Sequence, residues 1–349
     1  MEPTEALTRI ASLLERQREP RYRVQAFRRA AVAIRDVPIE ELRHLADRGR
    51  LRDLPNVGDT IAAVIVEALQ GKTPAYLEKL ELDVVEPGSD AGNAIRAALR
   101  GDLHVHSDWS DGGDTIRTMA ERVRDVGHEY FALTDHSPRL KIAHGLSPER
   151  LREQLDVIAE LNRELNDGPR PLRILSGIEV DINEDGSLDQ EPDLLAEIDV
   201  VVASVHSKLR MDKAGMTRRM VAAMAHPDSD ILGHCTGRLV TGRGRPESEF
   251  DVDAVLDTCL QFDKALEINC RPERLDPPRR ILRQAVERGL KVSIDTDSHA
   301  AEQLDWQPFG TDRAAECDVP MDSIVNSWPV EQLLAWTASH GRGNAVAPR

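Results

Sequence analysis

Histidine and carboxylate side chains follow a series of short apolar runs in this 349-residue chain. The runs lie near residues 102–106, 130–136, 172–180, 199–206, 230–234, 265–269 and 291–297. Six of the eleven histidines stand at the ends of these runs, together with acidic residues. Imidazoles mixed with carboxylates suit Zn²⁺, Mn²⁺ or Fe²⁺ better than Mg²⁺ or Ca²⁺, which prefer oxygen ligands alone. The pattern therefore predicts a site for divalent transition-metal ions.

A cluster of this kind has a defined chemistry. His104 and His106 alternate along one predicted strand, so both side chains point to the same face. Divalent ions held close together can bind a phosphate, lower the pKa of a shared water and stabilise a departing oxyanion. A carboxylate usually bridges two such ions, and Glu179 is the candidate bridge. No G-x-S-x-G, P-loop or G-x-G-x-x-G motif is present, so serine, nucleotide-driven and NAD chemistry are not expected.

Alternating strands and helices must position these residues. Amphipathic stripes separate the apolar runs, for example Ile116, Met119 and Val123 at helical spacing. Gly127 and Gly289 stand just past predicted helix ends, immediately before a strand. Seven strands alternating with helices predict a parallel α/β domain. Its simplest form is a barrel with its site at the carboxyl ends of the strands.

The first part of the chain has a different pattern. Val24, Phe27, Ala31 and Ile34 recur at helical spacing, and a tight turn at 54–60 precedes a second apolar stripe. Short helices are therefore predicted up to about residue 85. A stretch rich in Gly, Ser, Asp and Asn then predicts a linker. The resulting division is a helical domain at 1–85, a linker at 86–99 and an α/β domain at 100–349.

Charge is distributed unevenly between these parts. The net charge is −16, yet residues 1–85 hold 14 basic and 14 acidic side chains, so the excess of acid lies after residue 85. Residues 9–52 contain twelve Arg and six acidic residues. Such an acidic body is compatible with an anion-repelling surface or with a metal site counted without its ions. The basic front piece is compatible with a phosphate-bearing partner.

Composition excludes several classes of protein. Hydrophobic residues make up 40% of the chain, which is ordinary for a globular protein, and no apolar run approaches the ~18 residues of a membrane helix. The acidic amino terminus does not resemble a secretory signal. The four cysteines form no CxxC pair and are typical of reduced thiols. We therefore expect a cytoplasmic protein without a membrane partner. A monomer is compatible with the sequence, which leaves the oligomeric state open.

Seven motifs occur in the order typical of one family. They are DLHVHSDWSDG, ALTDHS, SGIEVDI, ASVHS, ILGHC, LEINCRPERLD and IDTDSH. Over about residues 100–310 they resemble the polymerase and histidinol phosphatase (PHP) superfamily. They are most similar to the PHP domain of bacterial family X DNA polymerases. The resemblance implies a distorted seven-stranded (β/α)7 barrel with three divalent ions (Mn²⁺, Zn²⁺ or Fe²⁺).

The resemblance also implies roles for single residues. The implied ligands form three groups: His104, His106, Glu179 and Asp297 for one ion; Glu179, His206 and His234 for the second; Asp111, His136 and His299 for the third. Asp108 is the alternative ligand on the loop of Asp111. Glu179, His206 and Asp297 are the residues implied in catalysis. Arg271 and Arg274, just beyond the sixth predicted strand, are candidate contacts for the substrate phosphate.

The amino-terminal part resembles the helix-hairpin-helix (8-kDa-like) domain of the same polymerases. The segments RYRVQAFRRAAVAIRD and LPNVGDTIAAVIVEAL carry the likeness across about residues 5–82. The turn residues implied in DNA binding are Asn56, Val57, Gly58, Asp59 and Thr60. A turn leading into a helix offers backbone N–H groups to a DNA phosphate without reading bases. Asn56 replaces the usual first glycine of this hairpin, and it adopts a left-handed conformation less freely.

Two departures from the resemblance limit the function. Val64 stands where lyase-active relatives have a lysine, so a Schiff-base lyase reaction is not expected there. About fifteen residues separate the helical domain from the barrel, which leaves no room for a polymerase palm. A polymerase is therefore not expected.

Three functions remain open. The first is a metal-dependent DNA phosphodiesterase acting in repair. It would be a 3′–5′ exonuclease, with abasic-site cleavage or 3′-end processing as variants. The second is a small-molecule phosphatase, with histidinol phosphate as the family's example. The third is a DNA-binding protein whose metals are structural. The basic helical domain favours the first over the second, and the complete set of ligand types argues against the third.

Overall fold

The computed structural model describes residues 1–82, 87–167, 170–241 and 243–341, apart from the side chain of Arg21. The chain divides into two compact units, Met1–Glu86 with Val240–Gly244, and the remainder. Each unit is described by itself. Within the described residues, no helix combines the length and the apolar character needed to cross a membrane.

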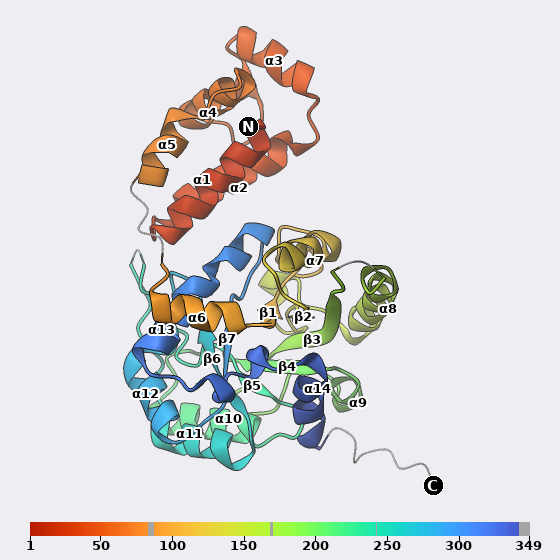
Figure 1. The fold of residues 1–349 in the computed structure, drawn as a ribbon, viewed down its shortest axis with the longest axis vertical. Helices are drawn as coiled ribbons and strands as arrows, with labels where there is room; N and C mark the ends of the chain where they lie inside the picture. Colours follow the sequence, from red (N-terminus) through yellow and green to blue (C-terminus); the bar gives the residue numbers. More distant parts are fainter. Residues whose placement is uncertain (83–86, 168–169, 242, 342–349) are drawn as a thin grey trace. The chain divides into compact units, whose positions relative to one another are not determined.

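The first unit consists of helices. Its elements are α1 (Pro3–Arg16), α2 (Arg21–Arg35), α3 (Ile39–Asp47), η1 (Leu51–Asp53), α4 (Asp59–Leu69) and α5 (Ala75–Leu82) (Figure 1). Leu7, Ile10 and Leu14 on one face of α1 pack with Phe27 of α2 and Ile65 of α4 in one apolar core. The helical domain predicted for this part of the chain is confirmed.

The second unit is a ring of seven parallel strands with helices outside it (Figure 1). The strands are β1 (Gly101–Val105), β2 (Tyr130–Leu133), β3 (Arg173–Asp181), β4 (Val200–Ser204), β5 (Ile231–Leu232), β6 (Ala265–Asn269) and β7 (Val292–Asp295). Each strand pairs in parallel with the next one in sequence. The predicted seven-stranded α/β barrel is therefore confirmed.

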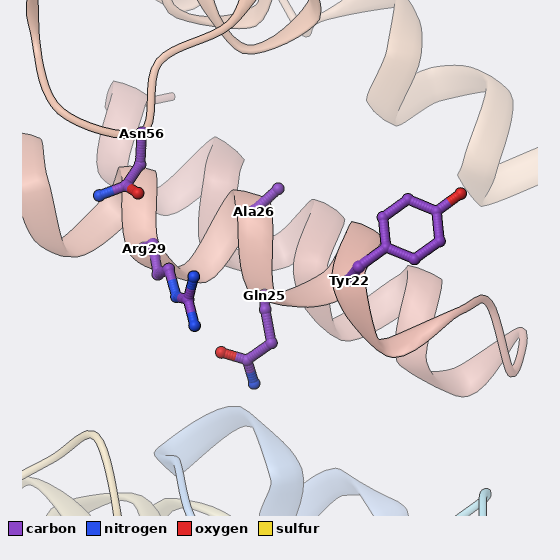
Figure 2. Close-up of a pocket in the computed structure, with 5 residues that line it drawn as sticks. All are labelled: Tyr22, Gln25, Ala26, Arg29 and Asn56. Atoms are coloured by element: carbon purple, nitrogen blue, oxygen red, sulfur yellow. The ribbon is translucent and has the colours of Figure 1, made fainter.

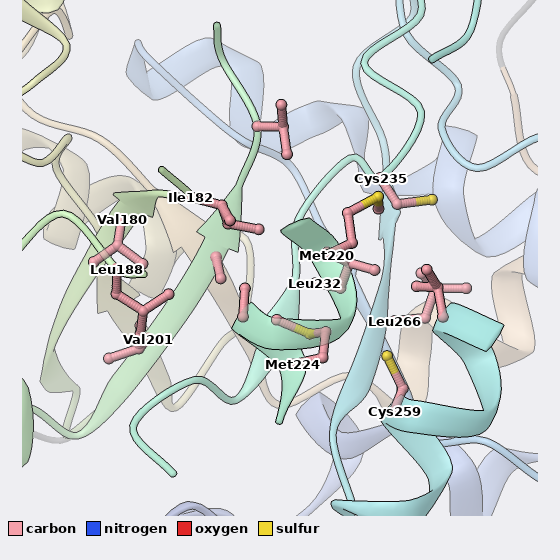
Figure 3. Packing of buried hydrophobic residues seen from close by; sticks show 14 of the residues in the cluster. Val180, Ile182, Leu188, Val201, Met220, Met224, Leu232, Cys235, Cys259 and Leu266 are labelled. Carbon is pink, nitrogen blue, oxygen red and sulfur yellow. The ribbon is translucent and has the colours of Figure 1, made fainter. Parts of the chain in front are cut away.

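The other elements of this unit connect or cover the strands. They are α6 (Asp90–Ala98), α7 (Ile116–Asp125), η2 (Lys141–Ala143), α8 (Pro148–Leu165), α9 (Pro192–Ala196), α10 (Lys213–Met224), α11 (Val252–Gln261), α12 (Arg279–Glu287), η3 (Ala301–Trp306), α13 (Gln307–Glu316), η4 (Met321–Ser323), η5 (Val325–Ser327) and α14 (Val330–Ser339). Figure 3 shows the apolar packing on one side of the sheet. There Val201 and Leu232 of the strands lie near Met220 and Met224 of α10 and Cys259 of α11.

The predicted linker at 86–99 is wrong over residues 90–98, where α6 forms. Ser89 caps this helix by accepting a hydrogen bond from the amide of Gly92. Asp312 of α13 accepts hydrogen bonds of 2.8 Å from the amides of Gly88 and Ser89 and from the Ser89 hydroxyl. The small polar residues that suggested a linker instead form the cap and first turn of a helix. The division between the units falls at residue 86, and α6 is part of the barrel unit.

The barrel closes at one seam mainly through side chains, beside an isolated backbone bridge between Val105 and Ser298. In the described part of the chain, no regular ladder joins β1 to β7. The amide of Leu103 donates to Asp295 Oδ1 at 2.8 Å, and Thr296 Oγ1 donates to Asp102 Oδ2 at 2.6 Å. The side chain of Asn326 joins the two strands, because its Nδ2 donates to the carbonyls of Gly101 in β1 and Ile294 in β7. These bonds replace the missing ladder and hold the first and last strands, which both lead into the candidate site.

We expect Asn326→Ala to lower the free energy of unfolding by about 3 kcal/mol, because it leaves buried main-chain groups unpaired. The amide bonds lost are those to Gly101 O (3.1 Å), Ile294 O (2.7 Å) and Ile294 N (3.1 Å). Urea denaturation measures this change. Asn93→Ala, at an exposed position on α6, is the matched control and should change stability little. Equal stabilities for the two variants would contradict this account of the seam.

Candidate metal centre

The carboxyl ends of the strands bring all nine predicted ligand residues into one cluster. His104 lies in β1 and Glu179 in β3, and the others follow strand ends or lie on the loop after β1. The nine residues are His104, His106, Asp111, His136, Glu179, His206, His234, Asp297 and His299. Most are buried, because parallel strands covered by helices bury both faces of the sheet. Their role as ligands remains a prediction.

Glu179 lies at the centre of the cluster and is 1% exposed. Its Oε2 atom lies 2.9 Å from His136 Nδ1 and 3.4 Å from His104 Nε2. Its Oε1 atom lies 2.9 Å from His234 Nε2 and 3.2 Å from His206 Nε2. The two carboxylate oxygens therefore face different sets of imidazoles. This is the arrangement expected of a carboxylate that bridges two ions.

Electrostatics keep this carboxylate charged. Burial alone would raise the pKa of Glu179, but the imidazoles of His206 and His104 hold it well below its usual value. Burial would likewise lower the pKa of His136, whereas the facing carboxylates Glu179 and Asp111 raise it to about 10. A cation that binds here must therefore displace a proton from His136.

The cluster contains three groups whose ligand atoms could share an ion. They are His106, Asp111, His136 and His299; His104, His106 and Asp297; and His136, Glu179 and His206. The first contains the predicted third set, with His106 added. The second contains three of the four residues predicted for the first ion. The last differs from the predicted second set, because His136 takes the place of His234.

The loop after β1 presents Asp111, and not Asp108, to this cluster. Asp111 Oδ1 lies 3.2 Å from His299 Nε2 and 3.4 Å from His136 Nε2. Asp108 is exposed and belongs to none of the groups found among the described residues. The structure thus favours the first of the two aspartates considered for this loop.

The donor set fits divalent transition-metal ions. At least one buried ring nitrogen has no hydrogen-bond partner in each of five imidazoles: His104, His106, His136, His206 and His234. An unpaired buried polar atom of this kind costs roughly 1–3 kcal/mol. Imidazole and carboxylate ligands together suit Zn²⁺, Mn²⁺ or Fe²⁺, and binding such an ion would satisfy these nitrogens.

Sequence reasoning missed the residues that orient this cluster. Glu267, fully buried in β6, lies with Oε1 2.6 Å from His104 Nδ1 and accepts a hydrogen bond from the amide of His234 through Oε2. Asp135 accepts hydrogen bonds from the amide (2.8 Å) and hydroxyl (2.6 Å) of Ser107, at the start of the loop that carries Asp111. For Asp135 the one signal in the sequence is its place directly before the candidate ligand His136, whereas no candidate ligand is adjacent to Glu267 in the sequence.

We expect Glu267→Gln to weaken metal binding or activity by roughly 10–100-fold, as is typical when a ligating histidine loses its outer carboxylate. Isothermal titration with Mn²⁺ or Zn²⁺ measures the affinity. The control is Glu287→Gln, which changes an exposed glutamate at the end of α12. An unchanged affinity in Glu267→Gln would show that His104 needs no such partner.

Two predicted phosphate contacts lie against the same centre. Arg271 Nη1 donates to Asp297 O at 2.9 Å, and Arg274 Nε lies 3.3 Å from Asp297 Oδ2. Both guanidinium groups are largely buried, and Arg271 also stacks over Trp306, with Cζ 5.3 Å from the ring centroid. Positive charge of this kind beside a metal cluster favours the binding of a phosphate.

The predicted DNA-binding turn of the first unit borders a pocket of about 560 Å³ (Figure 2). Its lining residues are Tyr22, Gln25, Ala26, Arg29 and Asn56. Asn56 has φ +61°, the left-handed conformation that a glycine would adopt freely. Gly58, Asp59 and Thr60 are exposed. Val57 is buried in the apolar core, so only its backbone remains available to a ligand.

Comparisons with known proteins agree with this geometry. Residues 1–74 match the helix-hairpin-helix domain model, and residues 102–271 match the PHP domain model. The chain is 39% identical to the Bacillus subtilis (strain 168) "DNA polymerase/3′-5′ exonuclease PolX" over 72% of its own length and 43% of that protein. It therefore spans less than half of this relative.

Two further proteins are similar to part of this chain. A "probable phosphatase" of Serratia proteamaculans (strain 568) is 28% identical, over 69% of this chain and 95% of that protein. A histidinol phosphate phosphatase from Lactococcus lactis, solved with zinc, L-histidinol and phosphate, is 19% identical with a TM-score of 0.43. That match covers 62% of this chain and 92% of the other. The two domain models and the barrel show that the chain carries an amino-terminal helix-hairpin-helix domain at residues 1–74 and, at residues 102–271, a PHP domain, the domain of a family of metal-dependent hydrolases.

Proposed function

We propose that the chain is a metal-dependent phosphodiesterase that removes nucleotides from the 3′ end of DNA. The observation that carries this proposal is the combination of a PHP centre and a helix-hairpin-helix domain in one chain. A relative named as a 3′-5′ exonuclease shares 39% identity over 72% of the chain, which supports it. The variants of this activity are abasic-site cleavage and 3′-end processing.

Each side chain of the centre has a task in this reaction. Bound divalent ions would supply a water of lowered pKa and neutralise charge on the phosphate. Glu179 would hold two ions through its separate oxygens, and His206 and Asp297 would complete their coordination. Arg271 and Arg274 would orient the phosphate, because guanidinium groups bind phosphate oxygens in a fixed geometry.

The first unit would bind the DNA backbone. Several of its arginines pair with acids, among them Arg23 with Glu19 and Arg28 with Glu15. Arg29 is exposed and lines the pocket beside Asn56. The first turn of α4 also offers unpaired amides, which bind phosphate at a helix start. This unit would therefore contribute affinity without sequence preference.

We expect Arg29→Glu to lower kcat/KM on DNA by about tenfold. The slope of the logarithm of DNA affinity against the logarithm of salt concentration should also decrease by the amount expected for about one phosphate contact. Hydrolysis of bis(p-nitrophenyl) phosphate, which has no DNA backbone for the first unit to bind, should stay unchanged. Arg43→Glu is the control, since Arg43 is exposed on α3 and already pairs with Glu40. Equal DNA activity in both variants would contradict a role for this pocket.

A small-molecule phosphatase is the second candidate. The observation in its favour is that the Serratia "probable phosphatase" is matched over 95% of its length. In that reaction the arginines at the centre would bind a phosphate monoester. The first unit would then have no part in catalysis, so Arg29→Glu would have no effect on any substrate.

A further inference from the structure

One large apolar side chain is almost fully exposed on the loop that begins at the candidate ligand His136. Ile142 lies in η2, on the loop between β2 and α8, and is 90% exposed. It is the most exposed of the large hydrophobic residues in the described chain. A single exposed isoleucine is common on protein surfaces. Its position and the rigidity of its loop make this one different.

The loop begins and ends at a candidate metal ligand. The amide of Leu146 donates to the carbonyl of His136 at 2.7 Å, which closes residues 136–146 into a ring. At its start, the amide of Ser137 donates to the carbonyl of Glu179 at 3.1 Å, and the amide of Arg139 donates to Asp189 Oδ2 at 2.6 Å. The base of the loop is therefore part of the centre itself.

The loop is also tightly packed. A Cβ atom at Gly145 would lie 1.8 Å from Ser137 O, so the two arms of the loop touch. Arg150 donates to the carbonyl of His144 at 2.7 Å and also to the carbonyl of Trp109, on the loop that carries Asp111. Arg150 therefore forms hydrogen bonds with both loops that border the centre. Ile142 is held out toward solvent on this scaffold.

The surroundings of Ile142 favour a polyanion with an apolar component. The neighbouring Lys141, and Arg139 and His144 on the same loop, are all exposed. Ile142 and Leu146 are four positions apart in the sequence, so the Cα of Ile142 lies at most ~14 Å from that of Leu146, which bonds to His136. This distance equals the rise of about four base-pair steps in DNA, at ~3.4 Å for each step. If the end of a DNA strand lies in the centre, its last few bases would lie within reach of Ile142.

We propose that Ile142 contacts the bases next to the bond that is cleaved, as an apolar wedge against the end of the DNA. Isoleucine is among the side chains that proteins insert against base steps. Lys141 would bind the adjoining phosphate. This inference rests on the proposed function, because it requires DNA as the substrate. It identifies a side chain that would contact a DNA end but not a small phosphate ester.

The test compares Ile142→Asn, Ile142→Met and the unchanged protein on 3′-recessed duplex DNA and on bis(p-nitrophenyl) phosphate. We expect Ile142→Asn to lower kcat/KM on DNA by about tenfold, since an apolar base contact is lost. Ile142→Met should retain most of the DNA activity, and both variants should hydrolyse the small ester normally. Leu260→Asn, at a partly exposed position on α11 next to the opposite end of the strands, is the matched control.

The outcomes separate this inference from the proposed function. If the unchanged protein degrades DNA and Ile142→Asn does so within twofold of it, the wedge is overturned and the exonuclease stands. If the unchanged protein hydrolyses only the small ester, the exonuclease and the wedge are both overturned. If Ile142→Asn slows both substrates equally, the residue acts on the centre and not on DNA, which also overturns the wedge.

Discussion

Glu179→Gln should lower kcat/KM on any phosphate ester by at least about 10³-fold, more than the roughly 10–100-fold typical of losing an outer partner of a ligand. The physical reason is the position of this carboxylate between two sets of imidazoles, with Oε1 facing His206 and His234 and Oε2 facing His104 and His136. Glutamine retains the shape but removes the negative charge and one acceptor oxygen. Metal content per chain, measured by elemental analysis, should fall together with activity.

The matched control is Glu184→Gln. Glu184 is an exposed glutamate that follows β3 a few residues after Glu179, and it forms a 4.0 Å ion pair with Arg139. We expect nearly unchanged activity and metal content there. A Glu179→Gln variant that keeps its metal, binds DNA and functions as the unchanged protein does would instead support the hypothesis of a DNA-binding protein with structural metals.

Removal of the metal should lower the melting temperature by at least about 5 °C. A ligand at 100 times its Kd stabilises the folded state by ~2.7 kcal/mol, and each kcal/mol shifts Tm by ~2–4 °C in a domain of this size. Nε2 of His104 and both ring nitrogens of His106 and His206 are buried without a hydrogen-bond partner among the described residues, and a bound ion would satisfy them. Calorimetry in EDTA, followed by addition of Mn²⁺ or Zn²⁺, measures the shift.

The same shift should depend on pH. In the metal-free protein the facing carboxylates Glu179 and Asp111 outweigh burial and raise the pKa of His136 to about 10, so this imidazole holds a proton at neutral pH. An ion must displace that proton, and apparent affinity therefore rises about tenfold per pH unit for each proton released. We expect a larger stabilisation at pH 8 than at pH 6. A Tm that EDTA does not change at either pH would contradict a metal centre in this cluster.

The sequence predicted the barrel because its signals are local. Each apolar run is a parallel strand buried on both faces, and the glycines at 127 and 289 lie between a helix end and the next strand, three positions before the first residues of β2 and β7. His104-x-His106 followed from the two-residue period of a strand. In a barrel the carboxyl ends of all strands meet at one edge, so residues at the strand ends can be grouped from the sequence alone.

The remaining features depend on contacts between distant parts of the chain. Glu267 contacts His104 across 163 residues, and Asn326 bonds to Gly101 across 225 residues. Nothing in the local pattern marks either residue. The exchange of His136 for His234 in one ligand group depends on side-chain directions within the cluster. The α6 helix was missed for another reason, since Ser, Asp, Gly and Asn favour both linkers and helix starts.

The most direct test of the central claim uses one preparation and two substrates. Duplex DNA labelled at its 3′ or 5′ end is incubated with Mn²⁺, and histidinol phosphate is offered to the same amount of protein in parallel. The account predicts stepwise shortening from the 3′ end, with loss of this activity in Glu179→Gln and retention in Glu184→Gln. Release of phosphate from histidinol phosphate while the DNA stays intact would contradict it.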